Sequence, residues 1–344
     1  STPNIPGMPR KGEQRDYRAL ELALSEEYDV RMVKVDEGSV PSDIDVLVVG
    51  KPGVLTPKRQ YAIDQFLMRG GSLIFMAGTY AIKPERSGLQ ALRQDDTIFD
   101  LIKSYGLSVE DAFVMDPRNT SFPIPVQQRR GPTVMNRIEL LPYPFFPNIR
   151  PDAFNPEHVA MKGVPGLAST WASPVKLAGK TDESGNAILD ETGLPVIALP
   201  EGLKGEYLAW TSAESWLKYD TRLEPDFQTY PDKGFGAPSD AVRGYQPIAA
   251  AVTGRFTSHF AERPSPLFGD TTSEDDAAKA NRTGRTLKTS NAEARLVVIG
   301  TSEFTSDLVT QMGQQIGGGT YRGNILFIRN LVDWAIADTD MLKI

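Results

Sequence analysis

Residues 44–77 read IDVLVVGKPGVLTPKRQYAIDQFLMRGGSLIFMA, and this stretch decides the fold class. Its two ends, 44–49 and 72–77, are nearly continuous apolar runs, which are typical of strands buried on both faces of a parallel sheet. Between them, Thr56 precedes a proline that can open a helix, and a pair of glycines can end that helix. The order strand, helix, strand predicts a right-handed crossover between two parallel strands.

The alternation of helices and strands continues on both sides of this unit. Towards the N-terminus, the spacing of apolar residues predicts a helix over 12–28 and a half-exposed strand over 29–35. Towards the middle, it predicts a helix over 98–105 and a strand over 108–115. We therefore expect an α/β fold with a mostly parallel, flavodoxin-like sheet and helices on both faces.

The C-terminal part completes this sheet. RLVVIG at 295–300 is predicted as a buried strand, 311–323 as a glycine-rich connection, and Asn324 as the cap of a helix that is apolar nearly all round. Such a helix packs in a core.

Prolines dominate the middle of the chain. They recur every few residues over 117–174, and proline excludes central strands and helix interiors, so we expect loops with short edge strands there. The segment 263–291 has few large apolar residues and is predicted to be a mobile surface excursion. We expect one large domain over 1–344, in which 1–116 and 294–344 form the main sheet and 117–293 is a proline-rich, loop- and strand-rich insertion. Further elements expected in the insertion are strands over 176–200, 207–212 and 246–256, a turn over 182–186 and a long loop over 217–243.

Composition excludes several classes of protein. Of the 344 residues, 40% are hydrophobic and 24% are charged, which describes a globular chain and not a collagen-like, disordered or multi-span membrane one. The net charge of -7, without a basic cluster interleaved with aromatic residues, argues against a nucleic-acid partner. The absence of cysteine removes disulfides, zinc thiolates and a cysteine nucleophile. Because His158 and His259 are the only imidazoles, metal sites and Ser-His triads are also scarce.

Two features bear on the compartment. The absence of cysteine fits an extracytoplasmic bacterial domain, where unpaired thiols are a liability. The sequence shows neither a signal-peptide pattern nor a run of about 18 apolar residues. We therefore expect a fragment excised from a longer protein, with any membrane anchor outside it.

The best candidates for a binding site follow the predicted buried strands. In an open parallel sheet, ligands bind in the crevice beyond the carboxyl ends of the strands. The residues that the sequence places there are Lys51, Tyr80, Thr301, Ser302 and Glu303. The alternative is that these polar residues only make the turns.

Other motifs favour structural interpretations. The glycine-rich runs at 234–239 and 317–319 do not lie between a strand and a helix, so they do not predict a phosphate loop. The close carboxylates, at 43 and 45, 95 and 96, and 274–276, are typical of a strand entry, a helix cap and a solvated loop. The four tryptophans favour core anchors over a sugar-stacking platform. We therefore predict no cofactor, no metal site and no catalytic residues.

Four ordered motifs resemble the extracytoplasmic ABC-transporter auxiliary family, which contains the gliding-motility component GldG. They are the stretch 44–77 with its IDQFLMRGG core, YQPIAAAVTGRFTSHF at 245–260, RLVVIGTSEFTSD at 295–307, and the closing segment 324–344. One departure is Ala77-Gly78-Thr79, which stands where the family usually has an Asp-Pro pair after the strand.

The resemblance implies a glutamine-amidotransferase-like fold that lacks the Cys-His-Glu chemistry of glutamine amidotransferases. It also implies a non-catalytic, membrane-anchored periplasmic domain that associates with an ABC permease and ATPase and binds protein partners or a cell-envelope ligand. Two alternatives stay open. One is a hydrolase that uses Glu303, His259 or Asp116 as acid or base in the strand-end crevice. The other is a carbohydrate-binding domain with exposed aromatic rings.

Overall fold

The computed structural model describes residues 16–85, 88–130, 133–191, 193–267, 286–291, 293–315 and 319–336. The main sheet has five strands in the order β1-β2-β14-β13-β11. These strands are β1 (Val46–Gly50), β2 (Ser72–Met76), β14 (Ala294–Ile299), β13 (Pro247–Gly254) and β11 (Leu203–Trp210). The pairings β1-β2 and β2-β14 are parallel, whereas β14-β13 and β13-β11 are antiparallel.

The unit predicted over 44–77 is confirmed. β1 and β2 pair in parallel and are joined by α2 (Pro57–Met68), whose N-cap Thr56 accepts a hydrogen bond from the amide of Arg59 through its hydroxyl. At the other end of α2, Gly70 has φ 95°, the left-handed conformation that glycine adopts without strain.

The predicted extent of the main sheet is wrong in two ways. The sheet is mixed instead of mostly parallel, because β11 and β13, both within 117–293, join its far edge in antiparallel orientation. Residues 108–115 do not join it: β5 (Leu107–Val109) and β6 (Phe113–Met115) form separate two-stranded sheets with β10 (Val175–Leu177) and β12 (Trp216–Lys218).

Residues 29–35 are not a strand, which corrects a second prediction. They lack ladder hydrogen bonds, although Val33 and Val35 pack on the core of one sheet face and Val30 on the core of the other. The alternation that suggested a strand is therefore satisfied by packing alone. The preceding helix, α1 (Arg18–Leu24), is shorter than expected.

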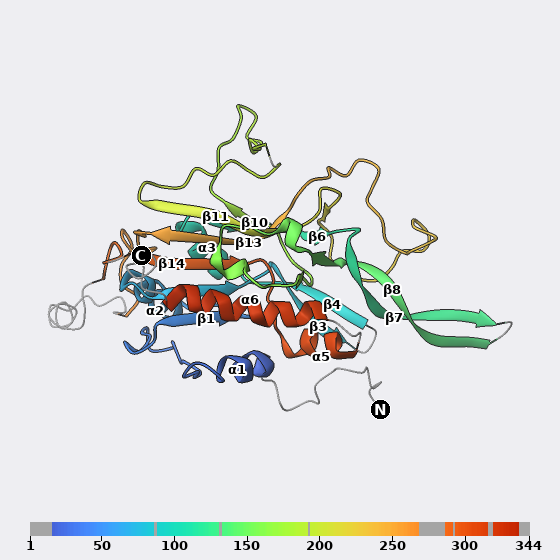
Figure 1. Cartoon of the computed structure of the whole chain (residues 1–344), viewed down its shortest axis with the longest axis horizontal. Coiled ribbons are helices and arrows are strands. Elements are labelled where there is room, and N and C mark those ends of the chain that lie inside the picture. Colours follow the sequence, from blue (N-terminus) through green and yellow to red (C-terminus); the bar gives the residue numbers. More distant parts are fainter. Residues whose placement is uncertain are drawn as a thin grey trace.

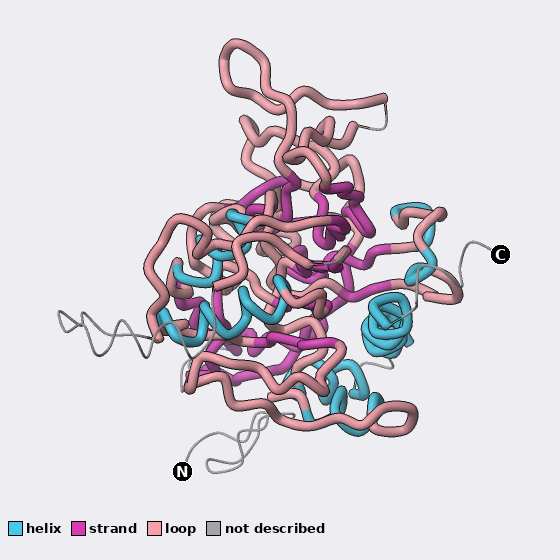
Figure 2. Tube along the Cα trace, turned by 90° about the vertical axis from the view of Figure 1, so that its left-hand side faces the viewer, coloured by secondary structure: helices cyan, strands magenta, loops and turns pink. Residues whose placement is uncertain are grey.

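Helices cover both faces of the sheet, as predicted. On one face, α2 and α3 (Thr97–Ser104) pack on one set of alternate strand residues. On the other face, α1 and α6 (Gly319–Ile336) pack on the intervening set. Figure 1 shows α6 crossing in front of the sheet, and Figure 2 shows the strands between the two groups of helices.

Residues 150–174 of the proline-rich segment are loops with short elements, as predicted, but its first part, 117–149, is not. This first part forms a long hairpin of β7 (Asn119–Arg130) and β8 (Thr133–Ile149), which extends away from the sheet in Figure 1. The far end of β8 pairs with β9 (Leu167–Ala168), and η1 (Pro151–Ala153) and η2 (Val159–Met161) follow β8. A two-stranded ribbon tolerates proline because each strand keeps one edge free of partners.

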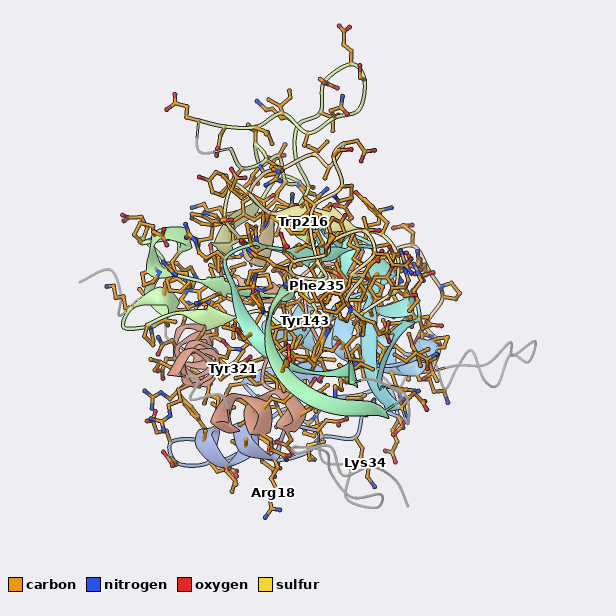
Figure 3. The ribbon with its side chains drawn as sticks, turned by 90° about the vertical axis from the view of Figure 1, so that its right-hand side faces the viewer. Arg18, Lys34, Tyr143, Trp216, Phe235 and Tyr321 are labelled. Carbon is orange, nitrogen blue, oxygen red and sulfur yellow. The ribbon has the colours of Figure 1, made fainter. Side chains whose placement is uncertain are left out.

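A third core lies where this hairpin meets the body of the protein. Figure 3 shows Tyr143, Phe235 and Trp216 among its side chains, and the rings of Tyr143 and Phe235 lie 5.3 Å apart, edge to face. Trp171 and Trp216 are 1% and 4% exposed, so both are core anchors, as predicted.

The C-terminal helices differ from the sequence prediction. The segment expected to be a glycine-rich connection contains the end of α5 (Asp307–Gln315) and the start of α6, so Asn324 lies inside a helix and does not cap one. Elsewhere in the chain, directly after β2, the strands β3 (Tyr80–Glu85) and β4 (Gly88–Arg93) form a small antiparallel hairpin.

The predicted mobile excursion over 263–291 lies mostly outside the described residues. Within the described part of its C-terminal end, Leu287 packs against the core and Thr289 forms a bridge with Thr257. Among the described helices, none is long and apolar enough to cross a membrane. The turn predicted over 182–186 is confirmed by the bond from the amide of Asp182 to the carbonyl of Asn186.

Candidate functional site

Four of the five predicted site residues lie at the carboxyl end of the parallel strands. Lys51 follows β1, and Thr301, Ser302 and Glu303 follow β14. The Lys51 ammonium nitrogen lies 3.0 Å from Oε1 of Glu303 and joins the two strand ends. Tyr80 does not belong to this group: its ring stacks on Phe113 in the third core, and burial raises its pKa to about 12.

The hydroxyl groups of this site bind neighbouring parts of the chain. The Thr301 hydroxyl donates to the carbonyl of Thr170 at 2.6 Å and accepts from the amide of Glu303 at 3.0 Å. The Ser302 hydroxyl accepts from the Gln94 side chain at 2.8 Å, and the same amide group donates to the carbonyl of Gly78 at 2.6 Å. These donors and acceptors therefore hold the fold together at the strand ends.

The backbone also packs closely at the strand ends. A Cβ atom on Gly300 would meet the carbonyl oxygen of Ser173 at 2.0 Å, and one on Gly78 would meet the carbonyl oxygen of Gly300 at 2.8 Å. The amide of Ser173 donates to that same Gly300 carbonyl at 2.7 Å. Residues 170–173, which belong to the proline-rich segment, thus close the crevice from one side.

The start of α1 covers the same crevice from another side. The Tyr17 hydroxyl donates to the carbonyl of Ser302 at 2.6 Å, and burial together with Glu303 and Asp16 raises its pKa. The carboxylate of Asp307 accepts from the amides of Arg18 and Ala19, at 3.2 and 3.0 Å, and so caps the first turn of α1. Several motif residues at the end of β14 therefore hold α1 in place.

Glu303 is the least satisfied group of the site. Its side chain is 1% exposed, and neither carboxylate oxygen has a hydrogen-bond partner among the described residues. The contact with Lys51 is thus an ion pair, and Lys51 holds it with a backbone φ of 44°, which is unusual for a residue with a side chain. The ion pair thus connects the segment after β1 with the segment after β14, and removal of Lys51 would leave the buried Glu303 without a partner.

The acid and base candidates do not form one site. The carboxylate of Asp116 accepts from the amide and the hydroxyl of Ser212, both at 2.8 Å. The ring of His259 contacts Arg263, and burial followed by that guanidinium lowers the pKa of His259. Each of the three candidates thus has different partners from the other two. Within the described ranges, no three His, Asp or Glu side chains gather as metal ligands would.

Sequence reasoning missed a network that joins two of the quoted motifs. Asp64, in the IDQF stretch of α2, is fully buried, and it accepts from the Ser258 hydroxyl and the His259 amide, both at 2.7 Å. The hydroxyl of Tyr105 donates to the same carboxylate at 2.9 Å. Next to it, Gln65 forms a pair of hydrogen bonds with the backbone of Leu287. The sequence signal for this network was the pair of adjacent polar residues, Asp64 and Gln65, on the otherwise apolar face of the predicted helix.

The closing motif, 324–344, also connects a helix to a distant segment, on the opposite face of the sheet. The Asn324 amide donates to the carbonyls of Ala168 and Phe304, at 2.8 and 2.7 Å, and its oxygen accepts from the amide of Ala168 at 2.9 Å. Asn330 donates to the carbonyls of Ala160 and Lys162, both at 3.0 Å. Both side chains tie α6 to the segment that follows β8.

A protein-family model covers this whole arrangement. The model is described as an ABC-type uncharacterized transport system, and it matches residues 7–331. The chain belongs to this family. It is therefore an auxiliary component of an ABC-type transport system, and the resemblance inferred from the four motifs is confirmed at this level.

Other comparisons add little to the family assignment. Among solved structures, the mmIFT52 N-terminal domain is similar with a TM-score of 0.44 and 10% sequence identity, covering 94% of this chain and 92% of that one. No curated protein sequence matches the chain significantly.

Proposed function

We propose that this auxiliary component is a non-catalytic, extracytoplasmic domain that binds protein partners of its transport complex, the ABC permease and ATPase, in a gliding-motility-type system. The observation that carries the proposal is the filling of the strand-end crevice. The hydroxyls of Thr301 and Tyr17 bind the protein's own backbone, Glu303 pairs with Lys51, and residues 170–173 pack against the strand ends. A surface that holds partners needs no such crevice.

The arrangement of titratable groups also supports a binding role over hydrolysis. General acid-base catalysis needs a group within hydrogen-bond reach of the reacting atoms. Glu303 faces Lys51, whereas Asp116 and His259 belong to other networks. The tryptophans Trp171 and Trp216 are buried and offer no ring to a sugar. The glutamine-amidotransferase-like or flavodoxin-like relationship of the fold stays a prediction.

Co-purification from native membranes tests the partner assignment. The complete tagged protein is expressed in its own cells, crosslinked, solubilised and purified, and the bound proteins are quantified by mass spectrometry against an untagged strain. We expect enrichment of one ABC permease and its ATPase. Enrichment of neither, with the tagged protein intact in the membrane fraction, would contradict the proposal.

Labelling of an engineered cysteine tests the compartment. Because this chain has no cysteine, Val242→Cys, at a position that is 86% exposed, adds one accessible thiol to it. A membrane-impermeant maleimide should label this variant above the level of the parent protein in intact spheroplasts. Labelling only after lysis would place the domain in the cytoplasm.

A Glu303→Gln variant separates the binding role from hydrolysis. A binding domain should retain its permease and ATPase after this substitution if it still folds. Loss of a hydrolytic turnover with the partners retained would favour the enzyme alternative.

A further inference from the structure

We infer that the free edge of β1 is a docking groove for an extended, cationic segment of a protein partner, which pairs with β1 as an added strand. This inference rests on the proposed function, because it names the surface through which such a domain would hold its partner. β1 is the outermost strand of the sheet, and within the described residues no hydrogen bond joins its outer edge to another segment.

A groove lies along this edge. Its volume is about 370 Å³, and residues 28–33 form its outer wall without pairing to β1. Its apolar floor comes from α1, β1 and α6 and consists of Leu20, Leu24, Val46, Val48, Val332 and Ile336. Unpaired backbone beside an apolar floor is the combination that recognises an extended peptide, with main-chain bonds for affinity and pockets for alternate side chains.

The apolar side chains at the rim are exposed to solvent. Met32 is 89% exposed and Ile336 is 48% exposed, and both line the groove. Large apolar side chains that gather beside an unpaired edge favour an interaction surface, whereas isolated ones need no explanation. These two residues lie on opposite sides of the edge, one on the outer wall and one on α6.

Charge selects the occupant. The lining holds the acidic residues Glu21, Asp29, Asp43 and Asp45, and its basic residue, Arg31, forms an ion pair with Asp43. An incoming strand with basic residues between apolar ones would match this lining. A second copy of the chain would bring the same acidic groove to the same edge, so like charges disfavour an edge-to-edge dimer.

Peptide binding tests this inference. The probe is a fluorescein-labelled peptide of four Val-Lys repeats, with matched peptides of four Val-Glu repeats and of Val-Lys repeats with alternate N-methylated amides. We expect saturable binding of the Val-Lys peptide, measured by anisotropy, and at least tenfold weaker binding of the other two. Equal binding of all three peptides, or no saturable binding of the Val-Lys peptide, would overturn the inference.

Matched variants locate the binding to the groove. Met32→Asp should weaken binding of the Val-Lys peptide at least tenfold, whereas Val242→Asp, at an equally exposed position outside the groove, should leave it unchanged. Equal weakening by both variants would refute the location. A concentration-dependent dimer that Met32→Asp abolishes would identify a second copy as the occupant and overturn the cationic partner. If the permease co-purifies but the Val-Lys peptide does not bind, only the assignment of the docking surface is wrong. Failure of the permease to co-purify contradicts the proposed function itself.

Discussion

Replacement of Asp64 by Asn tests whether the IDQF motif is structural. Four groups donate to the Asp64 carboxylate: the Tyr105 hydroxyl and the His259 amide to Oδ1, and the Ser258 hydroxyl and the Gln65 side chain to Oδ2. Asn has the same shape, but it presents an NH₂ group in place of one of these oxygens. Whichever way the amide turns, its NH₂ group meets one N–H donor, the His259 amide or the Gln65 side chain, which loses its acceptor, whereas the hydroxyl beside it can turn to accept.

The cost follows from these contacts. A buried donor without an acceptor costs about 1–3 kcal/mol, so the substitution should lower the free energy of unfolding by about 1–3 kcal/mol. Urea titration followed by circular dichroism measures this loss. Asp232→Asn, at an exposed loop position, is the matched control and should change the free energy by less than about 0.5 kcal/mol. A loss below about 1 kcal/mol for Asp64→Asn would refute the reasoning.

Four further predictions concern other positions of the fold. Asn324→Leu removes three hydrogen bonds to Ala168 and Phe304, so it should lower the free energy of unfolding by about 2–4 kcal/mol in the same titration, and an unchanged value would show that α6 does not depend on them. Burial, with a smaller effect of Arg295, lowers the pKa of His158 to about 4. The His158 side chain takes up a proton near pH 6.5 in the unfolded chain but only near pH 4 in the folded one. The free energy of unfolding should therefore fall by up to about 3 kcal/mol as the pH drops from 6.5 towards 4. In urea titrations at several pH values, His158→Gln should make this fall smaller. Gly70→Val should lower the free energy of unfolding by more than about 1 kcal/mol because φ at this position is 95°. Arg69→Ala should lower it by about 1–2 kcal/mol because the Arg69 guanidinium donates to the carbonyl of Val40 at 2.8 Å. Thermal unfolding midpoints that match the wild type would contradict both predictions.

The stretch 44–77 could be predicted from the sequence because every signal in it is local. The Thr56 cap, the left-handed Gly70 and the two apolar runs act within a few residues of each other, and each agrees with the others. Residues 29–35 show where local signals fail. Their alternation is real, and Val30 and Val33 do lie on opposite faces of the sheet, but periodicity does not show whether a neighbouring strand pairs with them.

The prediction for the proline-rich segment was wrong for a different reason. The rule that proline excludes strands applies to a strand with neighbours on both sides, where the missing amide breaks a ladder. In the β7-β8 hairpin, Pro123 and Pro125 lie on a strand that has one partner, with Leu140 and Ile138 opposite them. Whether a strand has one neighbour or two depends on the topology, which the local sequence does not contain. The same holds for β11 and β13, because their place in the sheet depends on contacts with β14.

The position of the candidate site could be predicted for four of its five residues, whereas a ligand-binding role stays a prediction. Lys51 and Glu303 do meet at the strand ends, because parallel strands bring their carboxyl ends to one edge of the sheet. Their partners come from Asp16, Tyr17 and the segment 170–173, which are distant in sequence, and these partners turn a potential ligand crevice into a packed junction.

The family motifs and the proposed docking groove overlap only in part: β1 and α6, which contribute to the groove floor, belong to two of the motifs. Asp64 and Asn324 each point inward and hold a helix to a distant segment, so the motifs that identify the family report how the fold is assembled. The groove beside β1 is lined on its outer wall by residues 28–33, which belong to none of the four motifs. A chain can then keep its assembly motifs while Met32 and its neighbours change, which would alter the partner and preserve the fold. If the groove binds a partner as we propose, differences in partner choice should be sought in its outer wall, residues 28–33.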